Sequence, residues 1–266
     1  MSQSSNQPSG ENAPEKVSRP DIKNVIAVLS GKGGVGKSSV SALLAAGARR
    51  ENYRVGLLDA DITGPSIPRM FGINGLSPDS KVSPAESSLG IKIMSLNLLL
   101  PSEDDPVIWR GPLIGGAVKQ FWTDIEWGEL DYLFIDLPPG TADAPLTVLQ
   151  SIPLDGLVVV TSPQELAVMV VKKGLKMARM MDVPILGLVE NMSEMICPHC
   201  GKQVELFGAS QGEEVSNTTG VPLMAKLPID HYLAECCDKG EVEQYQSNLF
   251  NEMYSLQQKQ NHSGGK

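Results

Sequence analysis

Short apolar runs recur along the chain and alternate with longer amphipathic segments. Residues 39–50 form an Ala- and Leu-rich segment, and residues 164–181 repeat apolar side chains at helical spacing with basic side chains on the other faces. Strand-like runs lie at 25–29, 54–58, 91–95, 132–136, 157–161, 184–190 and 221–227. Strands that alternate with helices are typical of a parallel sheet covered on both faces. The pattern predicts an α/β fold with three layers and a mostly parallel central sheet, and it places the methionines of the 164–181 helix in the core.

The two ends of the chain depart from this pattern. Residues 1–20 are polar, contain proline and offer almost nothing to bury, which predicts a disordered tail. Residues 241–260 predict a final helix, and residues 261–266 a frayed tail. The segment 21–260 suits one large domain, because no break in the pattern divides it.

Two internal segments lack a clear period. Residues 64–68 hold two prolines and a glycine, which predicts a shaped loop rather than regular structure. The tryptophans between residues 109 and 127 lie near an arginine and fit either a partner surface or packed core. Packed core is favoured, because aromatic side chains gain most from burial.

The composition limits the possible partners. The chain has 266 residues, a formal net charge of −9 and a pI near 4.9, which disfavours nonspecific binding to nucleic acid or to an acidic membrane. No apolar run approaches the roughly 20 residues of a membrane-spanning helix, and the first residues lack a basic and then apolar targeting signal. We therefore expect a cytoplasmic protein that binds proteins and small molecules, with no nucleic acid and no membrane as a partner.

The strongest motif directly follows the first apolar run. It reads Gly31-Lys32-Gly33-Gly34-Val35-Gly36-Lys37-Ser38, the GxxxxGK(S/T) spacing of a phosphate-binding loop. Glycines let successive backbone N–H groups turn toward an anion, and the following helix adds the positive end of its dipole. We expect Lys37 to reach the β- and γ-phosphates of a nucleotide and the Ser38 hydroxyl to hold Mg2+.

A second lysine, Lys32, lies inside this loop. Its cation must face solvent, fold back onto its own nucleotide, or cross to a nucleotide held by another subunit. Spacing alone does not separate these three arrangements.

Three aspartates follow predicted strands. Asp59 and Asp61 end the 54–58 strand, at the edge where open α/β sheets bind ligands, so one or both are expected to face the nucleotide. Asp136 ends the 132–136 strand and is interpreted as a carboxylate that accepts from Mg2+-bound water, with a helix cap as the alternative. The turn Pro138-Pro139-Gly140 is expected to leave the glycine N–H free to sense a γ-phosphate.

Two of the four cysteines stand as Cys197-Pro198-His199-Cys200, a spacing typical of metal or redox sites. A thioredoxin-like pair belongs to a different fold, and a structural zinc site needs four ligands where the chain has no second CxxC. Cys236 and Cys237 are adjacent and are interpreted as packing residues, and His199 as facing solvent. Two subunits about a two-fold axis would supply four thiolates, a number that suits a 4Fe-4S cluster and zinc equally.

These motifs together resemble a known family. Residues 31–39, Gly31 to Ser39, resemble the deviant Walker A motif of the MinD/NifH/ParA class of P-loop ATPases. Within that class the chain is similar to the Mrp/ApbC iron-sulfur carrier ATPases over residues 24–244, with departures at Thr63, where histidine is common, and at Ala142, where glycine is usual. The segments that carry the likeness are those beginning Asp59-Ala60-Asp61, Trp109-Arg110-Gly111-Pro112, Asp136-Leu137-Pro138-Pro139-Gly140, Glu190-Asn191-Met192-Ser193 and Cys197-Pro198-His199-Cys200.

The resemblance implies specific roles at the nucleotide. Lys32 would reach the nucleotide of the other subunit, Asp61 would lie near the attacking water, and Asp136 would be the Walker B-like carboxylate. Adenine would contact Asn191 and the segment Pro228-Ile229-Asp230. The catalytic set is Lys32, Lys37, Asp61 and Asp136, and the nucleotide-binding set is Gly31, Lys32, Gly33, Gly34, Val35, Gly36, Lys37, Ser38, Ser39, Asp59, Asn191, Pro228 and Asp230.

The resemblance also implies a function. Cys197 and Cys200 would bridge a 4Fe-4S cluster across a homodimer, and slow ATP hydrolysis would accompany transfer of the cluster to apo iron-sulfur proteins. A zinc-stabilised dimer is the alternative at the cysteines, and a NifH-like reductase would use an interface cluster to pass electrons. A MinD/ParA-like positioning switch needs a membrane-binding tail or a basic DNA-binding face, and this acidic chain shows neither.

Overall fold

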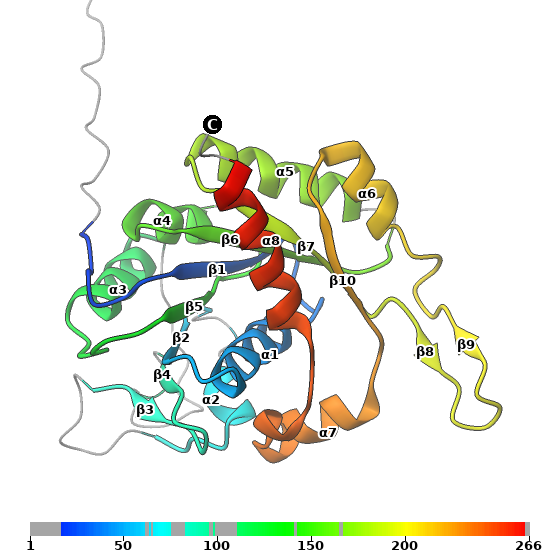
Figure 1. The fold of residues 1–266 in the computed structure, drawn as a ribbon, viewed down its shortest axis with the longest axis horizontal. Coiled ribbons are helices and arrows are strands. Elements are labelled where there is room, and N and C mark those ends of the chain that lie inside the picture. Colours follow the sequence, from blue (N-terminus) through cyan, green and yellow to red (C-terminus); the bar gives the residue numbers. More distant parts are fainter. Residues whose placement is uncertain are drawn as a thin grey trace, which may run out of the picture.

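The computed structural model describes residues 17–61, 64, 66–75, 83–95, 98, 111–140, 143–164 and 167–263. Its centre is an eight-stranded sheet in the order β10-β7-β6-β1-β5-β2-β4-β3, in which only β3 and β4 pair antiparallel (Figure 1). The strands of this sheet are β1 (Val25–Ser30), β2 (Val55–Asp59), β3 (Ala85–Glu86), β4 (Lys92–Ser95), β5 (Tyr132–Asp136), β6 (Gly156–Thr161), β7 (Ile185–Asn191) and β10 (Leu223–Leu227). The predicted α/β fold with a mostly parallel sheet is confirmed.

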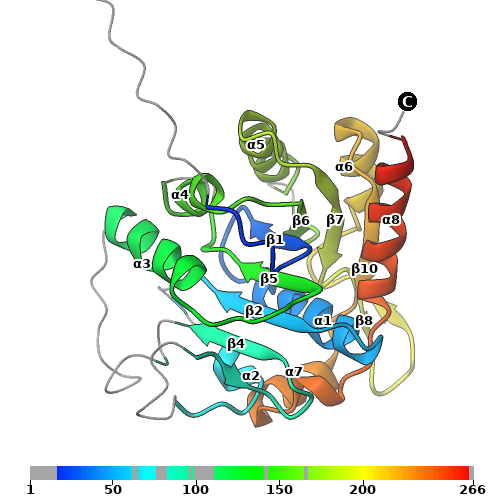
Figure 2. The same cartoon turned by 60° about the vertical axis from the view of Figure 1, so that its left-hand side comes forward.

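Helices cover both faces of the sheet, and each face has its own buried apolar cluster (Figure 2). One face carries α3 (Gly111–Thr123), α4 (Asp143–Ser151), α5 (Ala167–Met180) and α6 (Gly212–Thr219). The other face carries α1 (Lys37–Arg50), α2 (Ile67–Met70), α7 (His231–Lys239), the 3-10 helix η2 (Val242–Gln244) and α8 (Leu249–Ser263). Of the described helices, none has both the length and the apolar character needed to cross a bilayer.

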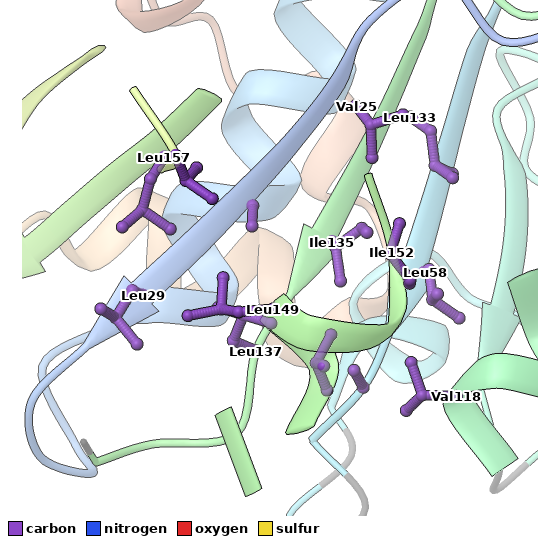
Figure 3. Close-up of a cluster of buried hydrophobic side chains, with 14 of the residues drawn as sticks. Val25, Leu29, Leu58, Val118, Leu133, Ile135, Leu137, Leu149, Ile152 and Leu157 are labelled. Carbon is purple, nitrogen blue, oxygen red and sulfur yellow. The ribbon is translucent and has the colours of Figure 1, made fainter. Parts of the chain in front are cut away.

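The central strand β1 divides its side chains between the two clusters. Val25, Ala27 and Leu29 belong to the cluster under α3 to α6, and Ile26 and Val28 to the cluster under α1 and α8. Figure 3 shows part of the first cluster, where side chains of β1 and β5 meet those of α3 and α4. All residues of β1 are buried. Each buried Val, Ile or Leu side chain contributes about 1.5–3 kcal/mol, which fixes the strand that delivers the loop at residues 31–36.

Parallel pairing brings the candidate site residues to one edge of the sheet. Asp59 and Asp136 are direct partners in the register between β2 and β5. Val28 of β1 is the partner of Asp136 on the other side, so the end of β1 lies beside the same carboxylate. Asn191 ends β7, which lies parallel to β6 and reaches the same edge.

The structure corrects the predicted boundaries near both ends of the chain. Residues 17–20 belong to the ordered body rather than to the predicted tail, because Arg19 donates to the Trp122 carbonyl oxygen at 2.7 Å and pairs with Asp21. The predicted helix at 241–260 is interrupted after η2, and α8 begins at Leu249, whose N–H donates to the Ser247 hydroxyl. Helix α8 then continues to residue 263, into the segment predicted as a frayed tail.

The predictions for two internal segments can also be compared with the structure. Within the predicted loop at 64–68, residues 67 onward form the single turn α2, with Pro68 in its first turn, where the missing N–H costs little. Trp122 and Trp127 are buried, as the core interpretation predicted. Trp109, Thr63 and Ala142 lie outside the described residues.

Candidate functional site

The loop between β1 and α1 is open on the side where a phosphate would bind. Gly34 and Gly36 have φ of 79° and 81°, a left-handed conformation that favours glycine. A Cβ added at Gly33 or Gly34 would meet no atom within 4 Å, whereas one at Gly36 would lie 2.1 Å from the Asn191 amide nitrogen. The glycines therefore serve two purposes, an open cradle at the front of the loop and a close approach of β7 behind it.

A cavity of about 250 Å³ lies over this loop. Its walls include Lys37, Ser38 and Ser39, Asp61, and Pro139 from the turn after β5. Hydroxyls, a lysine and the N-terminal end of α1 suit a polyphosphate, and the carboxylate and hydroxyl oxygens suit Mg2+. The residues present therefore fit a magnesium nucleotide.

Asp136 pairs with a lysine and with two serine hydroxyls at this cavity. Its buried carboxylate lies 2.8 Å from Lys37 Nζ and accepts hydrogen bonds from Ser38 Oγ at 2.6 Å and Ser41 Oγ at 2.7 Å. Lys37 Nζ also lies 3.5 Å from Asp61 Oδ2. The two residues that the motif assigns to phosphate and to Mg2+ are thus both held by Asp136.

Asp59 lies behind Asp61 rather than beside it. Its carboxylate accepts from the Asp61 N–H at 3.1 Å and from Ser95 Oγ at 3.3 Å. Burial and the nearby negative charge of Asp136 raise the pKa of Asp59 well above its ordinary value. Asp59 therefore supports the turn that presents Asp61 to the cavity, and Ser95, which sequence reasoning did not identify, completes that support.

The turn after β5 differs from its prediction. Gly140 has φ of 103°, and its N–H donates to the Ser30 carbonyl oxygen at 2.9 Å, so the expectation of a free glycine N–H is wrong for this structure. The reason is geometric, because the turn folds back against the end of β1. Pro139 still lines the cavity, so the turn contacts both the cavity and the start of the phosphate loop.

The predicted adenine residues divide into two groups. Asn191 donates from Nδ2 to the Val35 carbonyl oxygen at 2.9 Å, which joins the end of β7 to the phosphate loop. Asp230 caps α7 by accepting from the Tyr232 N–H, and it accepts from the Tyr245 hydroxyl, both at 2.8 Å. Burial and this bond to Asp230 raise the pKa of Tyr245 to about 12. The described lining of the cavity includes neither Asp230 nor Pro228.

Lys32 has no ionic partner among the described residues, although its carbonyl oxygen accepts from Ser30 Oγ at 3.0 Å. Gly33 and Gly34 beside it are exposed. The amine at this position is therefore available to an anion outside this chain.

Cys197 and Cys200 lie in the turn of a hairpin formed by β8 (Met195–Ile196) and β9 (Gln203–Val204). The hairpin projects from the body of the protein (Figure 1). The turn is closed by hydrogen bonds from Cys197 N to Lys202 O and from Gly201 N to Cys197 O, both at 2.9 Å. Hydrogen bonds from the backbone of Cys200 and His199 lower the pKa of the Cys197 thiol, which favours the thiolate form that binds metals.

The other two cysteines are separate from this hairpin. Cys236 is buried in α7, and Cys237 is half-buried beside Ser39, with its thiol pKa raised by burial. Among the described residues, no three His, Cys, Asp or Glu side chains gather as a metal site. One chain therefore offers two cysteine side chains at the hairpin.

The base of the hairpin is tied to the end of β7 by a buried glutamate that sequence reasoning gave no role. Glu190 is fully buried and accepts from Ser210 Oγ and from the Gln211 N–H at 2.7 Å. The other end of the hairpin is held where the N–H and the hydroxyl of Ser193 both donate to the Leu227 carbonyl oxygen. Because Glu190 and Asn191 are adjacent, the same strand end holds both the hairpin and the phosphate loop. A charged residue that ends an apolar strand was the available signal, since Glu is rarely buried without partners.

These features define a P-loop NTPase with a cysteine hairpin that follows the strand bonded to its phosphate loop. A ParA-type family model, described as NUBPL iron-transfer P-loop NTPase, matches residues 21–260. The chain belongs to this family.

Relatives of known name agree with this assignment. The iron-sulfur cluster carrier protein of Clostridium perfringens is 48% identical over 246 residues, which are 89% of this chain and 86% of the relative. The protein of the same name from Methanocaldococcus jannaschii is 49% identical over 223 residues, 82% of this chain and 77% of the relative.

Solved structures show the same fold. The nucleotide-binding protein of Archaeoglobus fulgidus in complex with ADP is 43% identical, with a TM-score of 0.76 and coverage of 86% of this chain and 91% of that one. The septum site-determining protein MinD of Pyrococcus horikoshii, with Mg-ADP, is 19% identical, with a TM-score of 0.59 and coverage of 91% and 98%. At that identity the likeness to MinD shows the fold alone, and it lends no support to a positioning switch.

The first prediction concerns Glu190. We expect Glu190→Ala to speed hydrogen exchange in residues 194–210 by about tenfold or more, because hydrogen bonds to a charged group contribute about 1.5–3 kcal/mol. The matched control is Glu243→Ala, which removes another buried carboxylate that accepts from Ser87 Oγ at 2.6 Å. That control should speed exchange near residue 87 and leave the hairpin unchanged. Hairpin exchange equal to wild type in the Glu190 variant would contradict the anchoring role.

The second prediction concerns the two kinds of thiol. A lowered pKa gives thiolate at lower pH, whereas a raised pKa delays it. Alkylation of metal-free protein should therefore reach half its limiting rate at a lower pH for Cys197 than for Cys237. Site-resolved mass spectrometry of iodoacetamide labelling across neutral and alkaline pH measures both midpoints. The reverse order of midpoints would show that the turn does not stabilise the Cys197 thiolate.

Proposed function

We propose that this chain is an ATP-dependent iron-sulfur carrier, which holds a 4Fe-4S cluster between two copies and transfers it to apoproteins. The observation that carries the proposal is the connection at the end of β7. Asn191 bonds the phosphate loop and its neighbour Glu190 bonds the base of the cysteine hairpin. A change at the nucleotide therefore has a short covalent path to the cluster ligands.

The residues proposed to bind the nucleotide contact one another in this structure. Lys37 lies against Asp136, and binding of ATP gives its amine the β- and γ-phosphates as new partners. Ser38 and Asp136, the latter through a bound water, are the residues that would hold Mg2+. The metal when bound offsets phosphate charge. Asp61, at the cavity wall near Lys37, is the residue placed to orient an attacking water.

Three features of the chain support the proposal of a second copy. The hairpin supplies two thiolates where a cluster takes four, and Lys32 lacks an ionic partner among the described residues. The segment around the cysteines also exposes Ile196, Leu206 and Phe207, each more than two-fifths accessible. Apolar side chains around a pair of metal ligands suit an interface that excludes water. A two-fold homodimer would account for all of these features.

In the proposed mechanism, two hydrogen bonds near the phosphate loop couple the nucleotide to the cluster. Gly140 N–H to Ser30 O joins the turn after β5 to the end of β1, and Asn191 to Val35 O joins the end of β7 to the phosphate loop. Closure of two loops around ATP shifts these contacts, and Glu190 carries the shift to the hairpin. A cluster held by only two thiolates from each copy is readily released when their separation changes. This mechanism gives hydrolysis a role in transfer.

The bridging assignment predicts the result of a double substitution. Cys197→Ala with Cys200→Ala should lose nearly all iron and sulfide after anaerobic reconstitution, because a cluster needs four thiolate ligands. The control, Cys236→Ala with Cys237→Ala, removes the same number of thiols and should keep the wild-type content. Iron and sulfide analysis with visible absorption measures the outcome. If the Cys197 and Cys200 double variant retains the cluster, the bridging assignment is wrong. If the wild-type protein contains zinc without sulfide, the zinc-stabilised dimer is favoured.

The dimer assignment predicts the effect of Lys32→Ala. This variant should bind nucleotide as a monomer about as well as wild type, but lose dimer formation with ATP and lower the hydrolysis rate at least about tenfold, as removal of a charge supplied in trans does. Light scattering with a non-hydrolysable analogue and a phosphate-release assay provide the measurements. The control is Lys119→Ala, which removes an exposed lysine from α3. Full ATP-dependent dimerisation in the Lys32 variant would refute the crossing role.

A further inference from the structure

Helix α5 carries a positive charge that contrasts with the rest of the chain. Lys172, Lys173, Lys176 and Arg179 lie within its 14 residues, which contain no acidic side chain, although the chain as a whole has a net charge of −9. All four cations are exposed. Among the described residues, none of them forms an ion pair, whereas Lys23, Arg54, Lys226 and Lys239 elsewhere each have a carboxylate partner. The charge of α5 is therefore uncompensated within the described structure.

The same helix exposes apolar side chains between its cations. Met169 and Met180 are 48% and 75% exposed, which corrects the expectation that the methionines of this helix are core, while Met177 is buried as expected. Two shallow cavities of about 500 and 520 Å³ lie along this surface, both lined by Lys172 and Lys176. The first cavity reaches α6 at Thr218 and Thr219, where Arg179 donates to the Thr219 carbonyl oxygen. We call this combination of α5 and the end of α6 the α5 surface.

We propose that the α5 surface binds an acidic amphipathic helix of a partner protein. A partner helix laid along α5 would place carboxylates against the lysines and apolar residues against Met169 and Met180. Helix α5 is about 21 Å long at 1.5 Å per residue, which suits a partner helix of about four turns. Exposed methionines adapt to different apolar shapes, so the surface suits a carrier that meets more than one partner.

A compact acidic helix suits this surface better than other anions do. A membrane or a DNA duplex presents negative charge over a wide area, and the acidic remainder of the chain repels such an area. A single helix presents its charge only where the lysines are. The acids beside this surface are Glu213 and Glu214 on α6 and Asp182 after α5; Glu213 pairs with Lys226, and among the described residues none of the three forms an ion pair with a cation of α5.

The position of the surface connects it to the cysteine hairpin. Helix α5 follows Pro163, and a Cβ added at Gly208, in the return segment of the hairpin, would lie 3.8 Å from the Pro163 carbonyl oxygen. The start of α5 is therefore close to the return segment of the hairpin. On the proposed carrier function, the partner seated on α5 is a recipient apoprotein.

The test measures binding directly and needs neither cluster nor hydrolysis. The probe is a fluorescent peptide of about 18 residues that is helical, with glutamates on one face and leucines on the other. The full-length protein is titrated at low and at moderate salt and the anisotropy is recorded. Lys172→Glu with Lys176→Glu is compared with Lys119→Glu and Lys259→Glu, which makes the same change in charge at exposed lysines of α3 and α8. Anionic vesicles, a short DNA duplex and the same peptide with lysine for glutamate are tested in parallel.

We expect the acidic peptide to bind more weakly as salt rises, because exposed charges are screened. The α5 variant should lower its affinity about tenfold and the control variant less than about twofold. Met180→Ser should weaken binding without changing the salt dependence. No binding of the acidic peptide, equal loss in both charge variants, or preferential binding of vesicles or DNA at this surface would overturn the proposal. Each readout is independent of cluster content, so failure here leaves the carrier function standing, and loss of cluster in the cysteine variant leaves the surface standing.

Discussion

The structure of the nucleotide site depends on one buried carboxylate, Asp136. An unpaired charge in this position would be costly, and removing one partner of a buried pair destabilises a protein by about 3–5 kcal/mol. Asp136 avoids that cost with an ion pair to Lys37 and hydrogen bonds from two serines of α1. The same contacts fix α1 to the end of β5, so Asp136 also holds in position the helix N-terminus that faces the cavity. One carboxylate therefore both pairs with the buried Lys37 and anchors the start of this helix.

Parallel strand ends extend this arrangement across the sheet. Asp59 and Asp136 are register partners, and the raised pKa of Asp59 follows from placing two carboxylates in one buried edge. Asp59 therefore supports the backbone at Asp61, while Asp136 forms the ion pair with Lys37. At the other side of β1, the end of β7 divides its two polar residues between the phosphate loop and the cysteine hairpin. The sheet edge thus joins the phosphate loop and the base of the cysteine hairpin.

Sequence patterns predicted the parts of this protein that rest on local rules. The strand before residue 31, the glycine spacing of the loop and the aspartate that ends β5 each follow from periodicity or motif, and the structure brings them together. The role of Glu190 did not follow, because its partners Ser210 and Gln211 are close only after the chain returns from the hairpin. The hydrogen bond from Gly140 to Ser30 is similarly long in range, and it overturned the expectation of a free N–H. The exposed methionines of α5 were misassigned because helical spacing identifies an apolar residue but not whether a neighbour covers it.

The polar groups of this nucleotide site contact one another, so a ligand must displace these contacts in order to bind. Lys37 and Ser38 both contact Asp136 here, so a nucleotide has to offer these groups at least as much as the carboxylate does. Phosphate charge and a metal ion provide that exchange, whereas a neutral ligand would not, because the displaced carboxylate needs a new cation when Lys37 leaves it. Lys32, by contrast, has no ionic partner in the described part of the chain. The proposed link between nucleotide binding and pairing of two copies rests on this contrast between the paired Lys37 and the unpaired Lys32.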